Sequence, residues 1–198
     1  MLSLTERRRR QTRNEIASEA CTLFLTNGYD TTTVEDVAAA AGVSRRTAYR
    51  HFPNKEDLVF VHGLIWLEAY DELLETRTPD ETTYEFLNRA VVGVGQAIQD
   101  MSEQVLPMLA LANSNEFLRT RLGRFQEQWI DRYVAAMAPD VGEDEEGFMA
   151  VAIMAGTLVG ITTAALGLWA MNQPDADLAS LTARALERVD SVWPDECR

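Results

Sequence analysis

The sequence predicts an all-α fold, and three observations support this class. Apolar residues recur every three to four positions along most of the 198 residues, which is the spacing of a helix face. No stretch alternates apolar and polar residues for long, and no Asn-Gly or Asp-Gly pair separates β-branched runs as in a hairpin. Hydrophobic residues make up 46% of the chain and charged residues 25%, which excludes a disordered or fibrous protein.

Four predicted N-terminal helices begin at residues that cap helices well. The caps are Ser3, Thr33, Ser44 and Asn54. Ser3 and Glu6 have the spacing of a capping box. The first three helices end at Asn27-Gly28, at Gly42 and at about His51. The fourth continues through residues 58–75.

Five further helices are predicted after a break at Pro79–Thr82. They cover about 83–101, 103–112, 115–138, 143–172 and 175–192. Within 115–138, the large apolar residues form a single stripe. Its members are Leu118, Leu122, Phe125, Trp129, Tyr133 and Ala136.

Residues 147–174 form a run of twenty-eight residues without a charge. Length alone allows a membrane span. Acidic residues flank the run on both sides, however, so the basic flank typical of a membrane helix is missing. A helix that is apolar all round is otherwise buried in a core or an oligomer interface, and we favour this alternative. Gly156-x-x-x-Gly160 would let another helix approach closely in either case.

Charge is divided unequally along the chain, whose formal net charge is −13. Residues 1–62 hold nine Lys and Arg against eight Asp and Glu, whereas residues 63–198 hold nine against twenty-three. Positive charge at one end of the chain can meet DNA phosphates. The acidic remainder would repel DNA and disfavour its non-specific adhesion to nucleic acid.

The segment from Thr33 to Lys55 has the layout of a helix-turn-helix, with Gly42 in a short turn between two short helices. Ala48 and Phe52 can face the core, which leaves the polar side chains of the second helix to project elsewhere. Arginine can bond guanine O6 and N7, threonine can contact base edges, and tyrosine and histidine can bond phosphate. Thr33 and Lys55 each stand at a helix start, where amide hydrogens attract phosphate. The alternative is a solvated basic face on a helical bundle.

These residues resemble a known family. The stretch TTTVEDVAAAAGVSRRTAYRHFPNKEDL, from Thr31 to Leu58, looks like the TetR family of bacterial transcriptional regulators, and the preceding Leu23-Phe24-x-x-x-Gly28-Tyr29 is similar too. The resemblance covers about residues 13–60. Ala48 departs from the pattern, because the family usually has a larger apolar or aromatic residue there.

The resemblance implies an all-helical protein of about nine helices, with a DNA-binding domain at 1–53 and a regulatory domain at 54–198. It also implies a homodimer formed through about 143–172 and 175–192. The expected function is that of a repressor that releases a palindromic operator when a small molecule binds the C-terminal domain. The alternative is a helical small-molecule-binding or scaffold protein without operator binding.

Motif positions identify the residues expected to bind double-stranded DNA. They are Thr33, Ser44, Arg45, Arg46, Thr47, Tyr49, Arg50, His51 and Lys55. The resemblance places Arg45, Arg46 and Thr47 on bases. It places Thr33, Tyr49, His51 and Lys55 mainly on phosphates. Arg7 to Arg10 resemble a flexible basic arm that some members lay along the DNA.

A small-molecule effector site is expected between the helices of the regulatory domain. Its candidate residues are Trp66, Phe86, Met108, Phe125, Trp129, Met154 and Thr157. For each of them the alternative is plain core packing, because aromatic and Met side chains at helical spacing are usually core. No buried-charge pattern points to a particular charge on the effector, so a mainly apolar or aromatic molecule is only a working hypothesis, and no cofactor is expected.

Neither an enzyme site nor a metal site is expected. His51 and His62 lack the spacing of metal ligands, and the acidic run 143–146 lacks the spaced ligands and glycine of a calcium loop. Cys21 is expected to be a small buried hydrophobe. No apolar signal segment follows Arg7 to Arg10, so a cytoplasmic location is expected.

Overall fold

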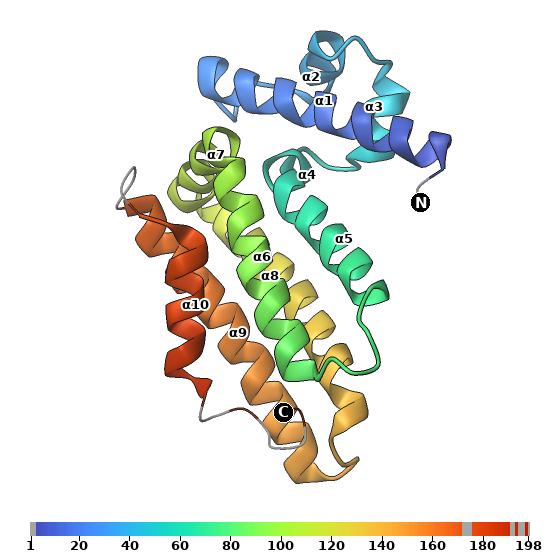
Figure 1. The fold of residues 1–198 in the computed structure, drawn as a ribbon. Helices are drawn as coiled ribbons and strands as arrows, with labels where there is room; N and C mark the ends of the chain where they lie inside the picture. Colours follow the sequence, from blue (N-terminus) through green and yellow to red (C-terminus); the bar gives the residue numbers. More distant parts are fainter. Residues whose placement is uncertain (1–2, 172–175, 191–192, 194–196, 198) are drawn as a thin grey trace. The chain divides into compact units, whose positions relative to one another are not determined.

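The computed structural model describes residues 3–171, 176–190, 193 and 197, and within them the chain is helical and has no strand (Figure 1). This confirms the all-α prediction. The α-helices are α1 (Leu4–Asn27), α2 (Val34–Ala40), α3 (Arg45–His51), α4 (Lys55–Val59), α5 (Val61–Glu75), α6 (Thr83–Asp100), α7 (Ser102–Ser114), α8 (Glu116–Met137), α9 (Glu145–Met171) and α10 (Leu178–Arg188). A short 3₁₀ turn, Ala138–Asp140, follows α8.

The described part of the chain has ten α-helices, one more than the expected number, because the predicted helix after Asn54 is interrupted. Phe60 ends α4 and its N–H bonds the carbonyl of Glu56, after which α5 begins at Val61. The predicted ends at 172, 175 and 191–192 lie outside the described residues.

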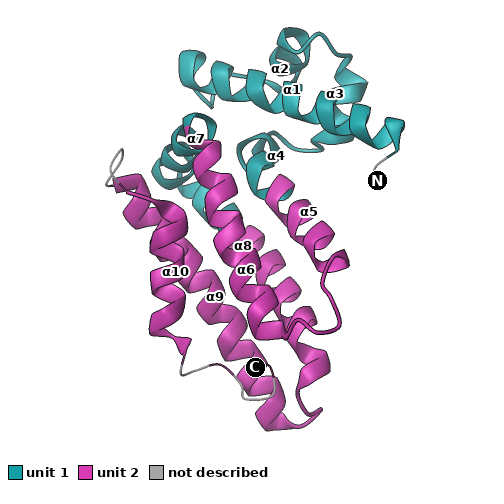
Figure 2. Cartoon of the chain, viewed as in Figure 1, with its two compact units in different colours: residues 1–64, 103–122 teal, residues 65–102, 123–198 magenta. Residues whose placement is uncertain are grey.

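The chain forms two compact units, which Figure 2 colours separately. Unit 1 contains the described parts of 1–64 and 103–122, and unit 2 those of 65–102 and 123–198. The proposed functional boundary at residue 53 stays a prediction, because compact units describe packing rather than function.

Unit 1 is built on capped helices whose apolar faces meet. Ser3 and Glu6 form the expected capping box, with hydrogen bonds of 3.2 and 2.7 Å. Thr33 forms a second such box with Asp36. The apolar core includes Ile16, Ala20, Phe24, Val37, Ala48, Phe52 and Leu58, each at most 4% exposed. Satisfied caps and buried apolar faces therefore hold the helix-turn-helix in place.

The turn between α2 and α3 needs a residue in the left-handed region. Gly42 has φ of 66°, and the N–H of Val43 bonds the carbonyl of Ala38 at 2.9 Å. An L side chain at this φ is strained. The turn sets how α3 follows α2, so this glycine is a structural requirement of the helix-turn-helix.

Gly42→Ala is expected to lower the free energy of unfolding by about 1–2 kcal/mol, through backbone strain alone. No described atom lies within 4 Å of an added Cβ, either here or at Gly123 inside α8. The matched control Gly123→Ala is expected to stabilise the protein by up to about 1 kcal/mol, because alanine favours helix. Urea denaturation measures both shifts, and shifts of the same sign would contradict this account.

In unit 2, α10 packs against α6 and α9. Gly95 of α6 allows close approach, because an added Cβ would lie 3.2 Å from Thr182 Oγ1 and 3.5 Å from Ala179 Cα. The Leu178 N–H at the start of α10 donates to Gln99 Oε1 at 2.7 Å. A close contact at a glycine and a partly buried hydrogen bond thus fix α10 along α6.

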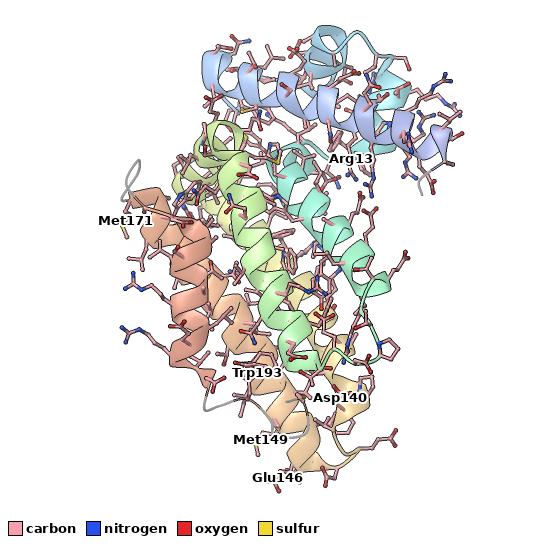
Figure 3. The ribbon with its side chains drawn as sticks, viewed as in Figure 1. Arg13, Asp140, Glu146, Met149, Met171 and Trp193 are labelled. Atoms are coloured by element: carbon pink, nitrogen blue, oxygen red, sulfur yellow. The ribbon has the colours of Figure 1, made fainter. Side chains whose placement is uncertain are left out.

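The described residues bury one face of helix α9. Its inward residues are Val151, Met154, Ala155, Leu158, Ile161, Ala165 and Trp169. The opposite face exposes Met149, Ile153 and Leu168 by 56%, 55% and 48%, and Met171 by 74% (Figure 3). Nothing described lies within 4 Å of a Cβ built on Gly156 or Gly160.

The charge-free helix α9 was expected to be buried in a core or an interface rather than to span a membrane. Its length and mean hydropathy of 1.9 would suit a membrane span, and 33% of that apolar window is buried. The helix forms part of a core that includes α6 and α10, as a helix of a folded domain does. The described residues of this chain cover one apolar face of α9 and leave the opposite apolar face exposed.

Candidate nucleic-acid interface

Helix α3 presents a polar face to solvent, as the expected recognition helix requires. Arg45, Arg46, Tyr49 and Arg50 are exposed, whereas Ala48 is completely buried. The side chains that project from α3 therefore carry three positive charges and one phenol. Chemically, they can donate hydrogen bonds to guanine and to phosphate.

Ser44 and Thr47 take part in the cap of α3. The Thr47 N–H donates to Ser44 Oγ at 3.1 Å, and the two hydroxyls lie 2.9 Å apart. Ser44 is exposed and Thr47 is half-buried. Both hydroxyls are therefore held at the start of the recognition helix, where a DNA backbone or base edge can meet them.

Glu35 of α2 joins the exposed side chains of α3, a role that the sequence did not indicate. Its Oε1 lies 2.8 Å from Nε of Arg45. The Tyr49 hydroxyl donates to both carboxylate oxygens, at 3.3 and 3.4 Å. The Arg45 guanidinium carbon also lies 5.4 Å from the Tyr49 ring centroid. An exposed ion pair of this kind contributes about 0–1 kcal/mol to stability.

Lys55 lies at the start of α4 and contacts the end of the first loop. Its Nζ lies 4.1 Å from the Tyr29 ring centroid and donates to the carbonyl of Asp30 at 3.4 Å. Burial raises the pKa of Tyr29 to about 12, and the carboxylates of Glu56 and Asp30 add to this. The Lys55 ammonium group is therefore held by the neutral ring of Tyr29 and the carbonyl of Asp30.

The end of α3 lies near arginines of α1. Burial lowers the pKa of His51 below its usual 6.5, and the charges of Arg50, Arg9 and Arg13 lower it further. His51 is therefore mostly neutral at pH 7 in the free protein. The unfolded state binds more protons than the folded state, so stability is lost as pH falls from 6.5 through the folded pKa.

Arg7 to Arg10 do not form a flexible arm, which corrects that expectation. They lie in the first turns of α1, which begins at Leu4 behind the Ser3 capping box. The capping box satisfies amide groups at the helix start, and helix therefore extends through the arginine run. The arginines are thus presented by a helix.

Operator affinity is expected to rise as pH falls from about 7.5 to 6.0, provided that His51 meets a phosphate. A nearby phosphate raises the pKa of the imidazole, so binding takes up a proton. Fluorescence anisotropy over this pH range measures the effect. In His51→Gln the change of operator affinity between pH 7.5 and 6.0 should be several-fold smaller. If the wild type and the variant depend on pH in the same way, then His51 does not contact a phosphate.

The expected effector residues are divided between the two units. Met108 belongs to unit 1, and the other six belong to unit 2. Trp66, Phe86, Met108, Trp129 and Met154 are buried, and Phe125 and Thr157 are half-buried. The Thr157 hydroxyl donates to the carbonyl of Ile153 at 2.7 Å, within its own helix.

Three of these residues belong to an aromatic cluster that also contains two tyrosines the sequence analysis did not select. The Tyr70 ring centroid lies 5.7 Å from those of Phe86, Trp129 and Tyr133. Phe125 contacts Trp129 at 6.4 Å. The Tyr70 hydroxyl is buried and has no hydrogen-bond partner among the described residues. Burial raises the pKa of Tyr70, so its hydroxyl keeps its proton and can donate to a ligand.

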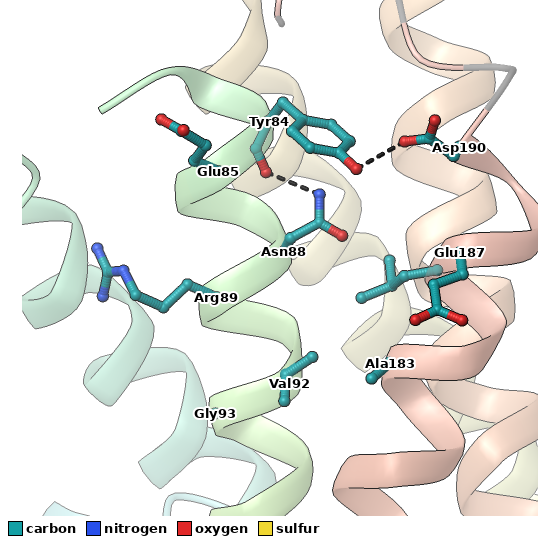
Figure 4. A pocket seen from close by; sticks show the side chains of 10 residues that line it. Tyr84, Glu85, Asn88, Arg89, Val92, Gly93, Ala183, Glu187 and Asp190 are labelled. Atoms are coloured by element: carbon teal, nitrogen blue, oxygen red, sulfur yellow. Dashed lines mark hydrogen bonds between the residues drawn. The ribbon is translucent and has the colours of Figure 1, made fainter. Parts of the chain in front are cut away.

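A surface groove of about 880 Å³ lies between α6 and α10 and contains none of the expected effector residues (Figure 4). The Tyr84 hydroxyl donates to Asp190 at 2.6 Å, and the Asn88 amide donates to the Tyr84 carbonyl at 2.8 Å. Arg89 is paired with Glu81 at 2.8 Å. Tyr84, Asn88 and Arg89 thus already have hydrogen-bond partners within the protein.

Among the described residues, no group of three or more His, Cys, Asp or Glu side chains is placed to hold a metal ion. Cys21 is buried as expected, and its thiol lies 3.9 Å from the Gln104 carbonyl. Burial raises the pKa of this thiol.

Comparison with known proteins gives consistent matches. The family described as "Bacterial regulatory proteins, tetR family" matches residues 16–61. The transcriptional regulator TcmR of Streptomyces glaucescens is 27% identical over 97% of this chain and 87% of its own. The repressor KstR2 of Mycolicibacterium smegmatis is 30% identical over 60% of this chain and 62% of its own. The structure of Thermus thermophilus FadR with lauroyl-CoA is similar with a TM-score of 0.59, at 23% identity, covering 89% of this chain and 92% of that one.

The helix-turn-helix, its exposed basic face and these relatives define a DNA-binding transcriptional regulator. Its relatives are regulators rather than enzymes. The chain belongs to the TetR family of bacterial regulatory proteins. The family resemblance drawn from residues Thr31 to Leu58 is therefore confirmed.

Proposed function

We propose that the protein is a homodimeric repressor that releases a palindromic operator when an apolar or aromatic effector binds its C-terminal helices. The observation that carries this proposal is the exposed arginine face of α3 in a helix-turn-helix of the TetR family. Binding and release are equilibrium steps, so the proposal needs no cofactor. Operator binding also implies a cytoplasmic location.

The dimer is proposed to form through α9 and α10. The outer face of α9 is apolar, with Ile153 and Leu168 exposed and Gly156 and Gly160 open between them. Small residues let a second helix approach closely, and covering exposed apolar side chains supplies the free energy. A second copy of the same chain suits this face, because a two-fold axis brings identical apolar surfaces together.

A two-fold dimer would place its two α3 helices in successive major grooves, about 34–36 Å apart. An effector that favours another spacing of these helices shifts the population away from the DNA-binding form. Coupling of about 1–3 kcal/mol would weaken operator binding roughly 5–150-fold.

The effector is proposed to bind at the aromatic cluster around Tyr70. Phe86, Trp129 and Tyr133 supply apolar aromatic surface, and the Tyr70 hydroxyl supplies a buried donor. An apolar or aromatic molecule with one hydrogen-bond acceptor fits this combination, because a site is usually apolar with few polar groups. The other expected residues of unit 2, Trp66, Phe125, Met154 and Thr157, remain proposals for the effector site.

Tyr70→Phe is expected to keep or raise stability and to weaken effector binding about 2–12-fold, the value of one hydrogen bond. The substitution removes a hydroxyl with no described partner but keeps the ring. The matched control is Tyr133→Phe, which removes the hydroxyl of a neighbouring buried tyrosine and keeps its ring, and it should leave effector affinity unchanged. Tryptophan quenching by compounds from a screen of aromatic and acyl molecules, with thermal melting, measures both. Unchanged affinity in Tyr70→Phe would exclude the proposed donor.

Selection of bound DNA from a random pool tests the proposed function. The expected product is a palindrome whose half-sites are about 10 base pairs apart, centre to centre, or a multiple of this. The enriched site is then searched for in the genome. If no sequence is enriched at low salt, the repressor proposal fails and a helical binding or scaffold protein without operator binding becomes the better account.

A further inference from the structure

The carboxylate of Glu35 on α2 lies among the side chains that project from α3. Its Oε1 is 2.8 Å from Arg45 Nε, and both of its oxygens accept from the Tyr49 hydroxyl. We propose that Glu35 is a positioning residue that orients Arg45 for guanine and restrains it from phosphate. This inference rests on the proposed use of α3 as the recognition helix.

The geometry of the guanidinium supports orientation towards a base. Glu35 Oε1 lies 2.8 Å from Nε of Arg45, and we assign the terminal Nη1 and Nη2 groups to guanine. These two nitrogens form the pair that bonds guanine O6 and N7. Tyr49 adds to the restraint, because its ring lies 5.4 Å from the guanidinium and its hydroxyl fixes the carboxylate.

The cluster is also accessible to DNA. The Arg45 side chain is 72% exposed and the Glu35 side chain is 41% exposed. A pair so exposed adds little to the stability of the fold, so fold stability does not explain it. We expect the pair to act instead on the orientation of the Arg45 side chain in the free protein, before DNA binds.

Restraint by Glu35 affects specific and non-specific complexes differently. In a non-specific complex an arginine gains mainly from phosphate, and a neighbouring carboxylate offsets its charge and repels that phosphate. In a specific complex the Nη groups meet a base edge while Nε remains with Glu35. Glu35 therefore raises the ratio of specific to non-specific affinity.

Glu35→Gln tests the proposal, because it removes the charge and keeps an acceptor for Tyr49. Glu15→Gln is the matched control, since Glu15 is an exposed carboxylate of the same unit that accepts from Gln11 at 3.0 Å. Anisotropy with the selected operator and with a scrambled duplex is measured at several salt concentrations. The wild-type dimer must first prefer the operator, and a lack of preference would refute the proposed function rather than this inference.

Glu35→Gln is expected to tighten scrambled-DNA binding about tenfold at ~0.1 M salt and to steepen its salt slope by about 2 per dimer. Operator affinity should change less than about threefold, so the specificity ratio falls. Glu15→Gln should leave this ratio unchanged. In an Arg45→Ala background the effect of Glu35→Gln should be smaller than in the wild-type background, as a double-mutant cycle shows for coupled residues.

Three results would overturn the proposal. The first is a Glu35→Gln protein with the same specificity ratio and salt slope as Glu15→Gln. The second is an undiminished effect of Glu35→Gln in the Arg45→Ala background. The third is a changed preference at a base position that Arg45→Ala leaves unaffected, which would show that Glu35 contacts a base itself.

Discussion

Ile153→Glu is expected to convert the proposed dimer into a monomer and to abolish tight operator binding. Ile153 is 55% exposed at the centre of the apolar face of α9, beside the open Gly156. A carboxylate there would be buried without a partner in the interface, which is strongly unfavourable. Loss of the second recognition helix removes the gain from two-site binding, which amounts to about 10²–10⁴ in affinity.

Leu74→Glu is the matched control for this prediction. Leu74 is an exposed leucine of a different helix, α5, and is 39% accessible. Sedimentation equilibrium should find a monomer for Ile153→Glu and a dimer for Leu74→Glu, with unchanged helical circular dichroism in both. A dimeric Ile153→Glu protein would exclude the α9 interface.

Arg45→Ala is expected to cost about 1–3 kcal/mol per half-site, which is about 2–6 kcal/mol for a dimer with two copies. The reason is the loss of two hydrogen bonds from the guanidinium to a guanine edge. The preference for guanine should relax at one symmetric position of the operator and stay unchanged elsewhere. Repeating the DNA selection with the variant measures this directly.

Arg119→Ala is the control for the loss of a positive charge. Arg119 is exposed on α8 in unit 1, outside the helix-turn-helix. Its removal should weaken all duplexes slightly and leave the selected sequence intact. If Arg45→Ala behaves in the same way, then Arg45 does not contact a base.

The helices and their caps could be predicted because their causes are local. Ser3 with Glu6 and Thr33 with Asp36 are capping boxes three residues apart, and both form as the sequence indicates. The break at Phe60 was not predicted, since the apolar pattern continues through it. Short sequence motifs such as capping boxes therefore predict where a helix begins better than where a helix is interrupted.

The contacts that the sequence did not indicate are tertiary. Glu35 meets Arg45 and Tyr49 only because the turn at Gly42 brings α2 and α3 together. Tyr70 lies at the centre of the aromatic cluster because α5, α6 and α8 place rings around it. No spacing within a single helix encodes either arrangement.

The exposed face of α9 could not be predicted for a related reason. The helix carries no charge from 147 to 171, so no polar face marks the side that the chain leaves uncovered. That side is decided by how α6 and α10 pack against it. The charge-free run therefore indicated an interface but not its position on the helix.

Charge is distributed unevenly along the chain. Residues 63–198 carry a formal charge of −14, whereas the exposed arginines of α3 lie in the first third of the chain, whose formal charge is +1. DNA is therefore attracted to one end of the chain and repelled by the rest. This distribution favours approach through the helix-turn-helix.

Hydroxyl-radical footprinting on the selected operator tests the central claim most directly. The account predicts two symmetric protected patches, centred about 10 base pairs or a multiple of this apart, which Arg45→Ala weakens and a bound effector removes. Uniform protection along any duplex, or protection that survives in Arg45→Ala at full strength, would contradict recognition of an operator by α3.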